Sequence, residues 1–424
     1  MILIKKDMKK SVIKSLLFVL PYIIVEFTNV FLILIDKSIS NSIGQTALVV
    51  FSSFITLNWA INTLQACISS SHSIVLVRNK GDSKDINTAG LFLELIFSFI
   101  TGLLLFYFAR NITHVYQLDN EARNILTIIL RLKAIQLPLV AVGYIAKNDL
   151  KVKKKTNLIF IIIFISSVIN IFGDIISIKI GYNEIGIYIA TIISTLVNTI
   201  LLFVVSKFKI GKIRKDYVKE ILKYGKDLAF NKIIQRIVNI TYTSIASSFG
   251  TVIYTIHCAC ITVSDTLSEI IAGYYNGLLI DYSNDIEKEN KNLLNKVDYI
   301  GIYGTLISIV FLIFMMYPSW WFLAKTVPWE DCNPYIWFYG IEFVMEVASS
   351  NYRAYLSANK NTKAIRNMAL IGGICVRIPL AFLFKKLGFG LLGLSLLCGI
   401  DRIVRLIYLR IYIKIASEKR LLYI

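Results

Sequence analysis

Repeated apolar runs of about 20 residues limit the fold of this chain more than any other feature of its sequence. Runs of this length suit α-helices that cross roughly 30 Å of hydrocarbon, and they lack the strict alternation of outer-membrane β-strands. Of the 424 residues, 56% are hydrophobic and only 17% are charged. A soluble core does not need this much apolar surface. We therefore predict an all-α integral membrane protein.

The apolar runs predict twelve transmembrane helices in two sets of six. The first set lies near residues 14–42, 47–76, 87–109, 124–146, 156–178 and 184–206. The second set lies near residues 221–248, 252–280, 297–318, 333–358, 364–384 and 390–412. Because the number of spans is even, both termini are expected on the same side of the membrane.

The loop charges predict the orientation of these helices. By our count, the loops on the side of the termini carry about 29 Lys and Arg residues, and the opposite loops carry about seven. Because short cytoplasmic loops are enriched in Lys and Arg, both termini are predicted to be cytoplasmic. Most basic residues lie in these loops and not on a polar domain, so the net charge of +19 does not indicate a nucleic-acid partner.

The predicted location is the cell membrane, as a multi-pass protein, and the richness in Ile, Lys and Asn indicates a bacterial source. We expect a monomer whose partners are the lipid bilayer and a small substrate. The cysteines form no CxxC pair and predict neither a disulfide framework nor a zinc site. They are Cys67, Cys258, Cys260, Cys332, Cys375 and Cys398. No cofactor is expected.

The two halves of the chain resemble each other when the sequence is shifted by about 207 residues. Hydropathy and loop charge match better than residue identities do. The predicted domains are an N-terminal six-helix bundle over 1–206, a basic cytoplasmic linker over 207–226 and a C-terminal six-helix bundle over 227–424. Repeats of six helices enter the membrane in the same sense, so a pseudo-two-fold axis along the membrane normal is expected, with the substrate path between the bundles.

Two polar residues stand out within the apolar span 156–178. Asn170 and Asp174 are four residues apart and therefore lie on one face of a helix. Their amide and carboxylate oxygens are the ligands that a hard cation or a proton requires. Ionisable groups are rare at this depth and often functional. A helix–helix hydrogen bond with a neutral Asp174 explains the spacing equally well, so the spacing alone leaves both interpretations open.

Motifs along the whole chain resemble one transporter family. In the first span, "LPYIIVEFTNVFLILIDKSISNSIGQTAL" contains Pro21, Asp36, Gly44, Ala47 and Leu48. This series resembles the proline, the "vDt" aspartate and the "lG..AL" turn of the multidrug and toxic compound extrusion (MATE) family. The family's "N...D" and "lGi.GaaiAT" motifs appear as Asn170, Asp174, Gly186 and "IAT" ending in Thr191. "LVRNKGDSKDINTAG" and "NKNTKAIRNMALIGGICVRIPLAFLFKKLGFGLLGL" resemble further family motifs in the expected order.

This resemblance implies a secondary active antiporter and not an enzyme. Inward movement of H⁺ or Na⁺ would drive multidrug efflux, the export of amphipathic drug-like or toxic compounds by alternating access. The cation site that the resemblance implies consists of Asp36, Asn170, Asp174 and Thr191, with Pro21 as a hinge in the first helix. Na⁺ at this site is the one metal that we expect.

The C-terminal half departs from the family pattern. Where some members carry a glutamate, this chain has Lys232 and Arg236 one helical turn apart. A possible cavity is marked by Lys232, Arg236, Asp265, Glu269, Glu342 and Glu346. The acids in this set form two pairs at i and i+4, which can bind an ion. They can equally neutralise Lys232, Arg236 or Arg353 as buried ion pairs, and we favour this second interpretation.

Two alternative functions remain open. The same superfamily includes flippases or exporters of lipid-linked sugars or peptides, with basic cavities. An anionic cargo suits four basic residues if they face the substrate path: Arg131, Lys133, Lys232 and Arg236. The intact cation-site motif favours drug export instead. A remote alternative is a membrane acyltransferase, because His114 and Asp119 have an HxxxxD spacing. The HxxxxD motif lies in a short loop without an accompanying phosphate-binding motif. An ATP-driven pump is disfavoured because the sequence has no GxxxxGK[ST] motif.

Overall fold

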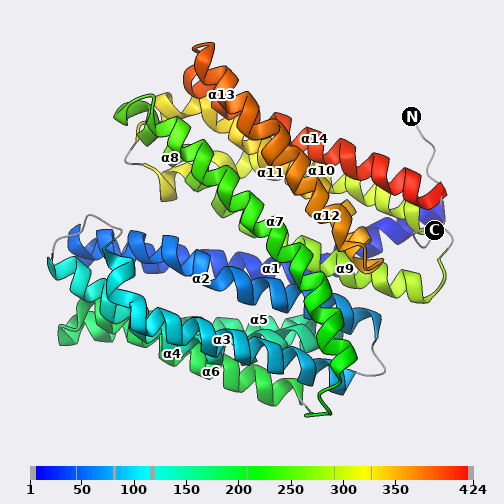
Figure 1. The fold of residues 1–424 in the computed structure, drawn as a ribbon, viewed down its shortest axis with the longest axis horizontal. Coiled ribbons are helices and arrows are strands. Elements are labelled where there is room, and N and C mark those ends of the chain that lie inside the picture. The colour runs from blue at the N-terminus through cyan, green and yellow to red at the C-terminus, as the bar shows by residue number, and fades with distance from the viewer. Residues whose placement is uncertain are drawn as a thin grey trace. The chain divides into compact units, whose positions relative to one another are not determined.

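The computed structural model describes residues 6–43, 45–79, 83–114, 120–207, 209–290, 292–325 and 327–418. Helices and short connections make up the described residues, with no β-strand among them (Figure 1). The predicted all-α fold class is therefore confirmed.

The first half of the chain contains six helices. They are α1 (Lys6–Ile43), α2 (Gln45–Arg78), α3 (Ser83–Thr113), α4 (Asn120–Val152), α5 (Thr156–Ile180) and α6 (Asn183–Ser206). Gly181 ends α5 with φ of 89°, and its N–H bonds to the carbonyl groups of Ile178 and Ser177. Glycine adopts this left-handed conformation without steric cost, so a tight turn into α6 follows.

The second half forms six further helices if interrupted segments are counted together. They are α7 (Lys215–Ser247), α8 (Thr251–Glu269) with α9 (Ile271–Glu287), α10 (Leu293–Leu323), α11 (Trp329–Ala358), α12 (Thr362–Ala369) with the π-helix η2 (Leu370–Arg377) and α13 (Ile378–Lys386), and α14 (Gly390–Glu418). Over the described residues, each predicted span coincides with one of these twelve helices.

Seven described helical segments are long and apolar enough to cross a membrane by length and composition. They are Met8–Thr28, Ser83–Thr113, Asn120–Val152, Thr156–Ile180, Asn183–Ser206, Leu293–Leu323 and Thr362–Lys386. Other helices contain more polar or ionisable side chains, for example Asp401, Arg402 and Arg405 within α14. The molecule is a multi-pass membrane protein.

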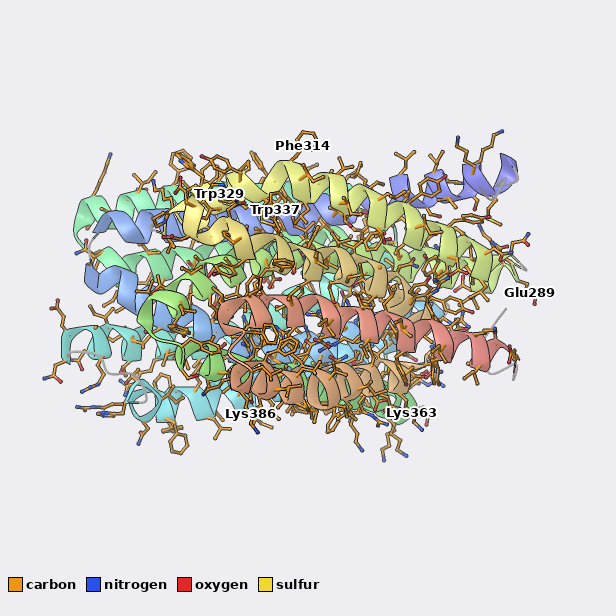
Figure 2. All side chains as sticks on the ribbon, turned by 90° about the horizontal axis from the view of Figure 1, so that it is seen from above. Glu289, Phe314, Trp329, Trp337, Lys363 and Lys386 are labelled. Carbon is orange, nitrogen blue, oxygen red and sulfur yellow. The ribbon has the colours of Figure 1, made fainter. Side chains whose placement is uncertain are left out.

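Large apolar side chains cover the outer faces of several helices, as expected for helices in contact with lipid tails. On α10, Phe314 is 71% exposed and Ile313 is 58% exposed. Figure 2 shows Phe314 pointing outward from its helix. The buried face of α10 instead carries small or compact groups such as Gly301, Gly304 and Ser308. The inside of each bundle is thus partly polar, while its outside is apolar.

Contacts between helices divide the described chain into two compact units. The first comprises the described part of Thr28–Lys226, in which α4 packs against α2, α3 and α6. Leu126, Leu130 and Leu137 of α4 lie fully buried in its core. Tyr188 of α6 joins this core and packs edge-on against Phe54 of α2.

The second unit comprises the described parts of Met1–Phe27 and Asp227–Ile424. Its central helix is α11, which packs against α8, α9, α10 and α14. The first half of α1 also belongs here, because Ser15 donates a hydrogen bond to Asp281 of α9 over 2.7 Å. We predicted that all of 1–206 lies in the N-terminal bundle, but these contacts group the start of α1 with the C-terminal helices. Boundaries drawn from loops cannot reveal this packing.

Candidate functional site

A buried polar cluster lies between α5 and α6 in the unit Thr28–Lys226. The Asn170 amide donates to Asp174 Oδ2 over 3.3 Å, and Ser194 Oγ donates to Asn170 Oδ1 over 3.0 Å. Asp174 is fully buried, and Asn170 is 6% exposed. Helical spacing explains the first contact, and the packing of α5 on α6 supplies the second.

Ser194 of α6, which was not among the predicted site residues, takes part in this cluster. The Thr191 hydroxyl bonds to its own helix at the Ile187 carbonyl over 3.1 Å. Ser194, one turn further along α6, bonds both to Asn170 and to the Thr191 carbonyl. Its position three residues after Thr191 was the available signal, because i and i+3 share a helix face.

The remaining residue of the predicted cation site, Asp36, and the predicted hinge, Pro21, belong to α1. The side chain of Asp36 lies outside the described residues, and so does Asp119 of the HxxxxD motif. Helix α1 continues through Pro21, the predicted hinge, from Lys6 to Ile43. The described members of the α5–α6 cluster offer carboxylate, amide and hydroxyl oxygens, which suit a proton or a hard cation. Within the described chain, no group of three or more His, Cys, Asp and Glu side chains suits a metal ion.

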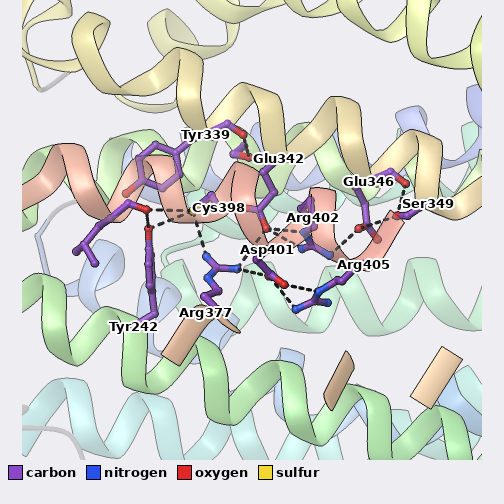
Figure 3. Close-up of polar contacts among 12 residues, drawn as sticks. Tyr242, Tyr339, Glu342, Glu346, Ser349, Arg377, Cys398, Asp401, Arg402 and Arg405 are labelled. Carbon is purple, nitrogen blue, oxygen red and sulfur yellow. Dashed lines mark hydrogen bonds and ion pairs between the residues drawn. The ribbon is translucent and has the colours of Figure 1, made fainter. Parts of the chain in front are cut away.

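A larger network of arginines and carboxylates lies in the other unit, between α11, η2 and α14 (Figure 3). Arg402 of α14 donates to Glu342 Oε1 from Nε over 3.1 Å and from Nη2 over 2.7 Å. Its Nη1 donates to Glu346 Oε2 over 2.6 Å. Glu346 also pairs with Arg353 at 2.5 Å. One guanidinium therefore connects two carboxylates on successive turns of α11.

Asp401 is the second centre of this network and is fully buried. Arg405 donates to it from Nε over 2.6 Å and from Nη2 over 2.9 Å. Arg377 of η2 lies 3.6 Å from Asp401 and 3.5 Å from Glu342, and it stacks over the Tyr242 ring with its Cζ atom 4.3 Å from the ring centroid. Bidentate pairing and stacking are favourable geometries for a buried guanidinium.

Two glycines of the π-helix η2 allow Arg405 of α14 to lie close to the η2 backbone. Gly372 and Gly373 of η2 face α14 and α7, and a Cβ atom added at Gly372 would lie 2.5 Å from Arg405 Cγ. A side chain there would push Arg405 away from its place. Short π-helices commonly occur at functional sites because they re-aim side chains.

This network borders a polar cavity. This cavity, of about 50 Å³, is lined by Gln235, Val238, Asn239, Ile261, Asp265, Glu342, Arg377, Arg402 and Arg405. A second, more open cavity of about 320 Å³ is lined by Arg236, Asn239, Ile240, Thr243, Ser244 and Tyr254. Asn239 lines both cavities. Within the described chain, the buried Arg377 Nε and Arg405 Nη1 atoms have no hydrogen-bond partner.

The structure brings most of the predicted C-terminal residues to this place. Asp265 and Glu342 line the smaller cavity and Arg236 lines the larger one, whereas Glu346 belongs to the arginine network through Arg402. Glu269 has Lys232 as an electrostatic neighbour. The acids of α11 pair with arginines, but apart from Arg353 these partners are Arg377 and Arg402, which the sequence analysis missed.

Arg377, Asp401, Arg402 and Arg405 could have been found from the sequence. They are ionisable residues inside the predicted spans 364–384 and 390–412, where such residues are rare and functional by default.

Two basic residues that the sequence analysis considered for an anionic cargo lie on α4, outside this network. Arg131 is exposed beside Phe106, and buried Lys133 donates to Gln136 over 3.1 Å.

Solved structures share this fold over nearly the whole chain. A MATE protein described in the bent conformation matches with a TM-score of 0.85 at 16% identity, over 97% of each chain. An outward-facing multidrug resistance MATE transporter of the MOP superfamily matches with a TM-score of 0.85 at 15% identity, over 96% of each chain. A MOP superfamily transporter from Pyrococcus furiosus Vc1, described by the reversed polarity of its binding pocket, matches with a TM-score of 0.84 at 15% identity, over 96% of each chain.

The fold is therefore that of the multi-pass membrane transporters of the MATE type, and the resemblance inferred from the motifs is confirmed at this level. The second and third of these structures are titled as transporters. The profile of the polysaccharide biosynthesis protein family matches residues 70–299, more than half of the sequence. The chain belongs to that family. A comparison with curated proteins finds no match.

Proposed function

We propose that this protein carries a lipid-linked saccharide across the membrane by alternating access, driven by inward movement of a cation. The cavity of the C-terminal unit is the main support. Its wall combines the guanidinium groups of Arg377 and Arg405 with the carboxylates of Asp265 and Glu342. Sugar hydroxyl groups both donate and accept hydrogen bonds, so they can satisfy a wall of this kind.

The same wall suits a phosphate and disfavours an apolar cargo. Guanidinium groups bind phosphate oxygens in a bidentate geometry. A hydrophobic compound would displace water from these polar groups without replacing the hydrogen bonds, at a cost of about 1 to 3 kcal/mol for each group. The family description, polysaccharide biosynthesis protein, agrees with a saccharide as the cargo.

The α5–α6 cluster supports coupling to H⁺ or Na⁺. Fully buried Asp174 and its neighbour Asn170 offer oxygens to a small cation at membrane depth. Each inward elementary charge supplies about 2.3 kcal/mol per 100 mV of membrane potential. Since 1.4 kcal/mol corresponds to about a tenfold change in an equilibrium constant, one or two charges can support a concentration ratio of roughly 100 for a neutral cargo.

Export of amphipathic drugs is the second candidate. It is favoured by the Asn170–Asp174 pair and by likeness to a structure titled as a multidrug resistance transporter. The polar character of the C-terminal cavity argues for the saccharide instead.

Transport by the purified full chain in vesicles tests this proposal. A polyprenyl-phosphate-linked disaccharide with a fluorescent label and a panel of cationic dyes serve as cargo, under separate pH and sodium gradients. We expect movement of the labelled lipid, and loss of gradient dependence in Asp174→Asn. Asn239→Leu should slow transport about tenfold, because it removes a polar group from the walls of both cavities.

Lys226→Gln is the matched control, since Lys226 lies exposed on the same helix as Asn239. It should leave transport unchanged. Movement of the dyes without movement of the labelled lipid would reject the saccharide in favour of drug export.

A further inference from the structure

A buried glutamate outside the sites described above has no partner for its carboxyl group. Glu94 of α3 is 0% exposed, and neither of its carboxyl oxygens has a hydrogen-bond partner among the described residues. The backbone of Ser69 on α2 lies close enough to interact with the carboxyl group. Within the described chain, an ionised carboxylate in this place is buried from water and has no basic side chain as a partner, so the protonated form is the stable one in this conformation.

The adjoining polar groups direct their hydrogen-bond donors away from the Glu94 carboxyl group. Gln65 of α2 donates to Ser98 Oγ over 2.6 Å and to the Leu137 carbonyl over 3.1 Å. Ser98 in turn donates to the backbone carbonyl of Glu94 over 2.5 Å. The amide oxygen of Gln65 has no donor within the described chain, like the two oxygens of Glu94. A proton on the Glu94 carboxyl group supplies a hydrogen-bond donor beside these unpaired acceptor oxygens.

Several titratable and charged side chains of the neighbouring helices have partners of their own. Among them are His72 on α2, Lys133 and Asp149 on α4, and Lys153 just after α4. Lys133 donates to Gln136, and Asp149 pairs with Lys153 at 2.5 Å while accepting a hydrogen bond from Asn87 over 2.8 Å. None of these contacts supplies charge compensation to Glu94.

His72 is held as a neutral imidazole. Asn87 donates to Asp149 through its amide nitrogen, so its oxygen must accept from His72 Nε2, over 3.0 Å. His72 Nδ1 then accepts from the amide of Asn148 over 3.3 Å. A second proton on the ring would make Nδ1 a donor facing the amide donor of Asn148, which is unfavourable. Gly90 allows this ring position, because a Cβ there would lie 2.5 Å from His72 Cδ2.

We propose that Glu94 is a proton-binding site of the transport cycle. It lies one turn of α3 from Gly90, which leaves room for the His72 ring. In the conformation described here, Glu94 is neutral and closed off from water. When the cycle exposes it, the carboxylic acid transfers its proton to water, which gives a carboxylate and a hydronium ion, and uptake reverses this step. The inference deepens the proposed function by identifying H⁺ as a coupling ion that binds apart from the α5–α6 cluster.

Infrared spectroscopy of the full chain in phospholipid vesicles tests the protonation state without any cargo. At neutral pH we expect the carbonyl band of a buried carboxylic acid, and Glu94→Gln should remove the part of this band that belongs to one carboxyl group. Glu121→Gln is the matched control, because Glu121 is exposed at the start of α4 in the same unit. A band unchanged by Glu94→Gln would overturn the proposal.

A transport measurement on the same vesicles tests the role in coupling. Glu94→Gln keeps the neutral shape of the protonated side chain, so folding and gradient-free exchange of the labelled lipid-linked disaccharide should persist. Accumulation driven by a pH gradient should fall to the level of exchange. Accumulation retained in Glu94→Gln would refute the coupling role. If wild type shows the infrared band but moves no saccharide, the cargo proposal fails and the proton site stands.

Discussion

Buried ionisable residues are the most informative single residues of this protein. In the C-terminal unit, Asp401 and Glu342 are compensated by arginines from η2 and α14. Glu94, in contrast, has no compensating partner among the described residues. A buried acid that pairs with an arginine can stay ionised and connect two helices. A buried acid without a basic partner is stable when it binds a proton.

Removal of Asp401 tests this distinction. Asp401→Ala should lower the free energy of unfolding by about 3 to 5 kcal/mol, because it leaves Arg405 and Arg377 as buried charges without this partner. Thermal denaturation of the purified protein in detergent measures the change. Asp331→Asn, at an exposed position in the first turn of α11, should cost less than about 1 kcal/mol. Equal effects of the two substitutions would contradict a structural role for the Asp401 pairs.

Close crossings of helices depend on small residues. Gly273 and Gly277 of α9 form a GxxxG pattern that packs on α1, and such patterns let two helix backbones approach within a membrane. A Cβ at Gly273 would lie 2.7 Å from the carbonyl carbon of Tyr22 and 2.8 Å from the Cα of Ile23. These neighbours are backbone atoms, so a rotamer change cannot relieve the overlap.

Gly273→Ala should therefore move α9 away from α1 and destabilise the protein by about 1 to 3 kcal/mol. The midpoint of thermal unfolding in detergent checks this expectation. Gly399→Ala is a matched control on α14, where the new methyl group would meet only the Ile341 side chain at 3.3 Å. If both variants unfold at the same temperature, the close crossing is not a stabilising contact.

At the scale of the whole molecule, the even number of predicted spans predicts that both ends of the chain lie on one side of the membrane. The loop charges predict that this side is cytoplasmic, since short cytoplasmic loops are enriched in Lys and Arg. Lys155 lies in the connection between α4 and α5, and Tyr182 lies in the next connection, between α5 and α6. These two exposed positions are predicted to face opposite sides.

Labelling of introduced cysteines in intact cells measures this orientation. In a Cys375→Ser background, which removes an exposed native thiol, Tyr182→Cys should react with a membrane-impermeant maleimide. Lys155→Cys should react only after the membrane is opened. The reverse pattern would invert the predicted topology.

The predicted spans coincide with the observed helices because hydrophobic length and flanking charge are local properties of a membrane segment. The Asn170–Asp174 contact also follows from local geometry, as residues four apart share a helix face. By contrast, Ser194 joins Asn170 only because α6 packs on α5. The partners of Glu342 lie 35 and 60 residues away and could not be assigned from spacing.

The sequence by itself determined the class of protein, the number and position of the helices and the residues of the candidate α5–α6 cluster that lie on one helix. These features depend on hydrophobicity and on periodicity along the chain. Only the tertiary structure decided that the arginines of η2 and α14 meet the acids of α11, that the start of α1 packs on α9, and that no described side chain pairs with the Glu94 carboxyl group. The reason is physical: compensation of a buried charge depends on neighbours brought together by packing between distant segments.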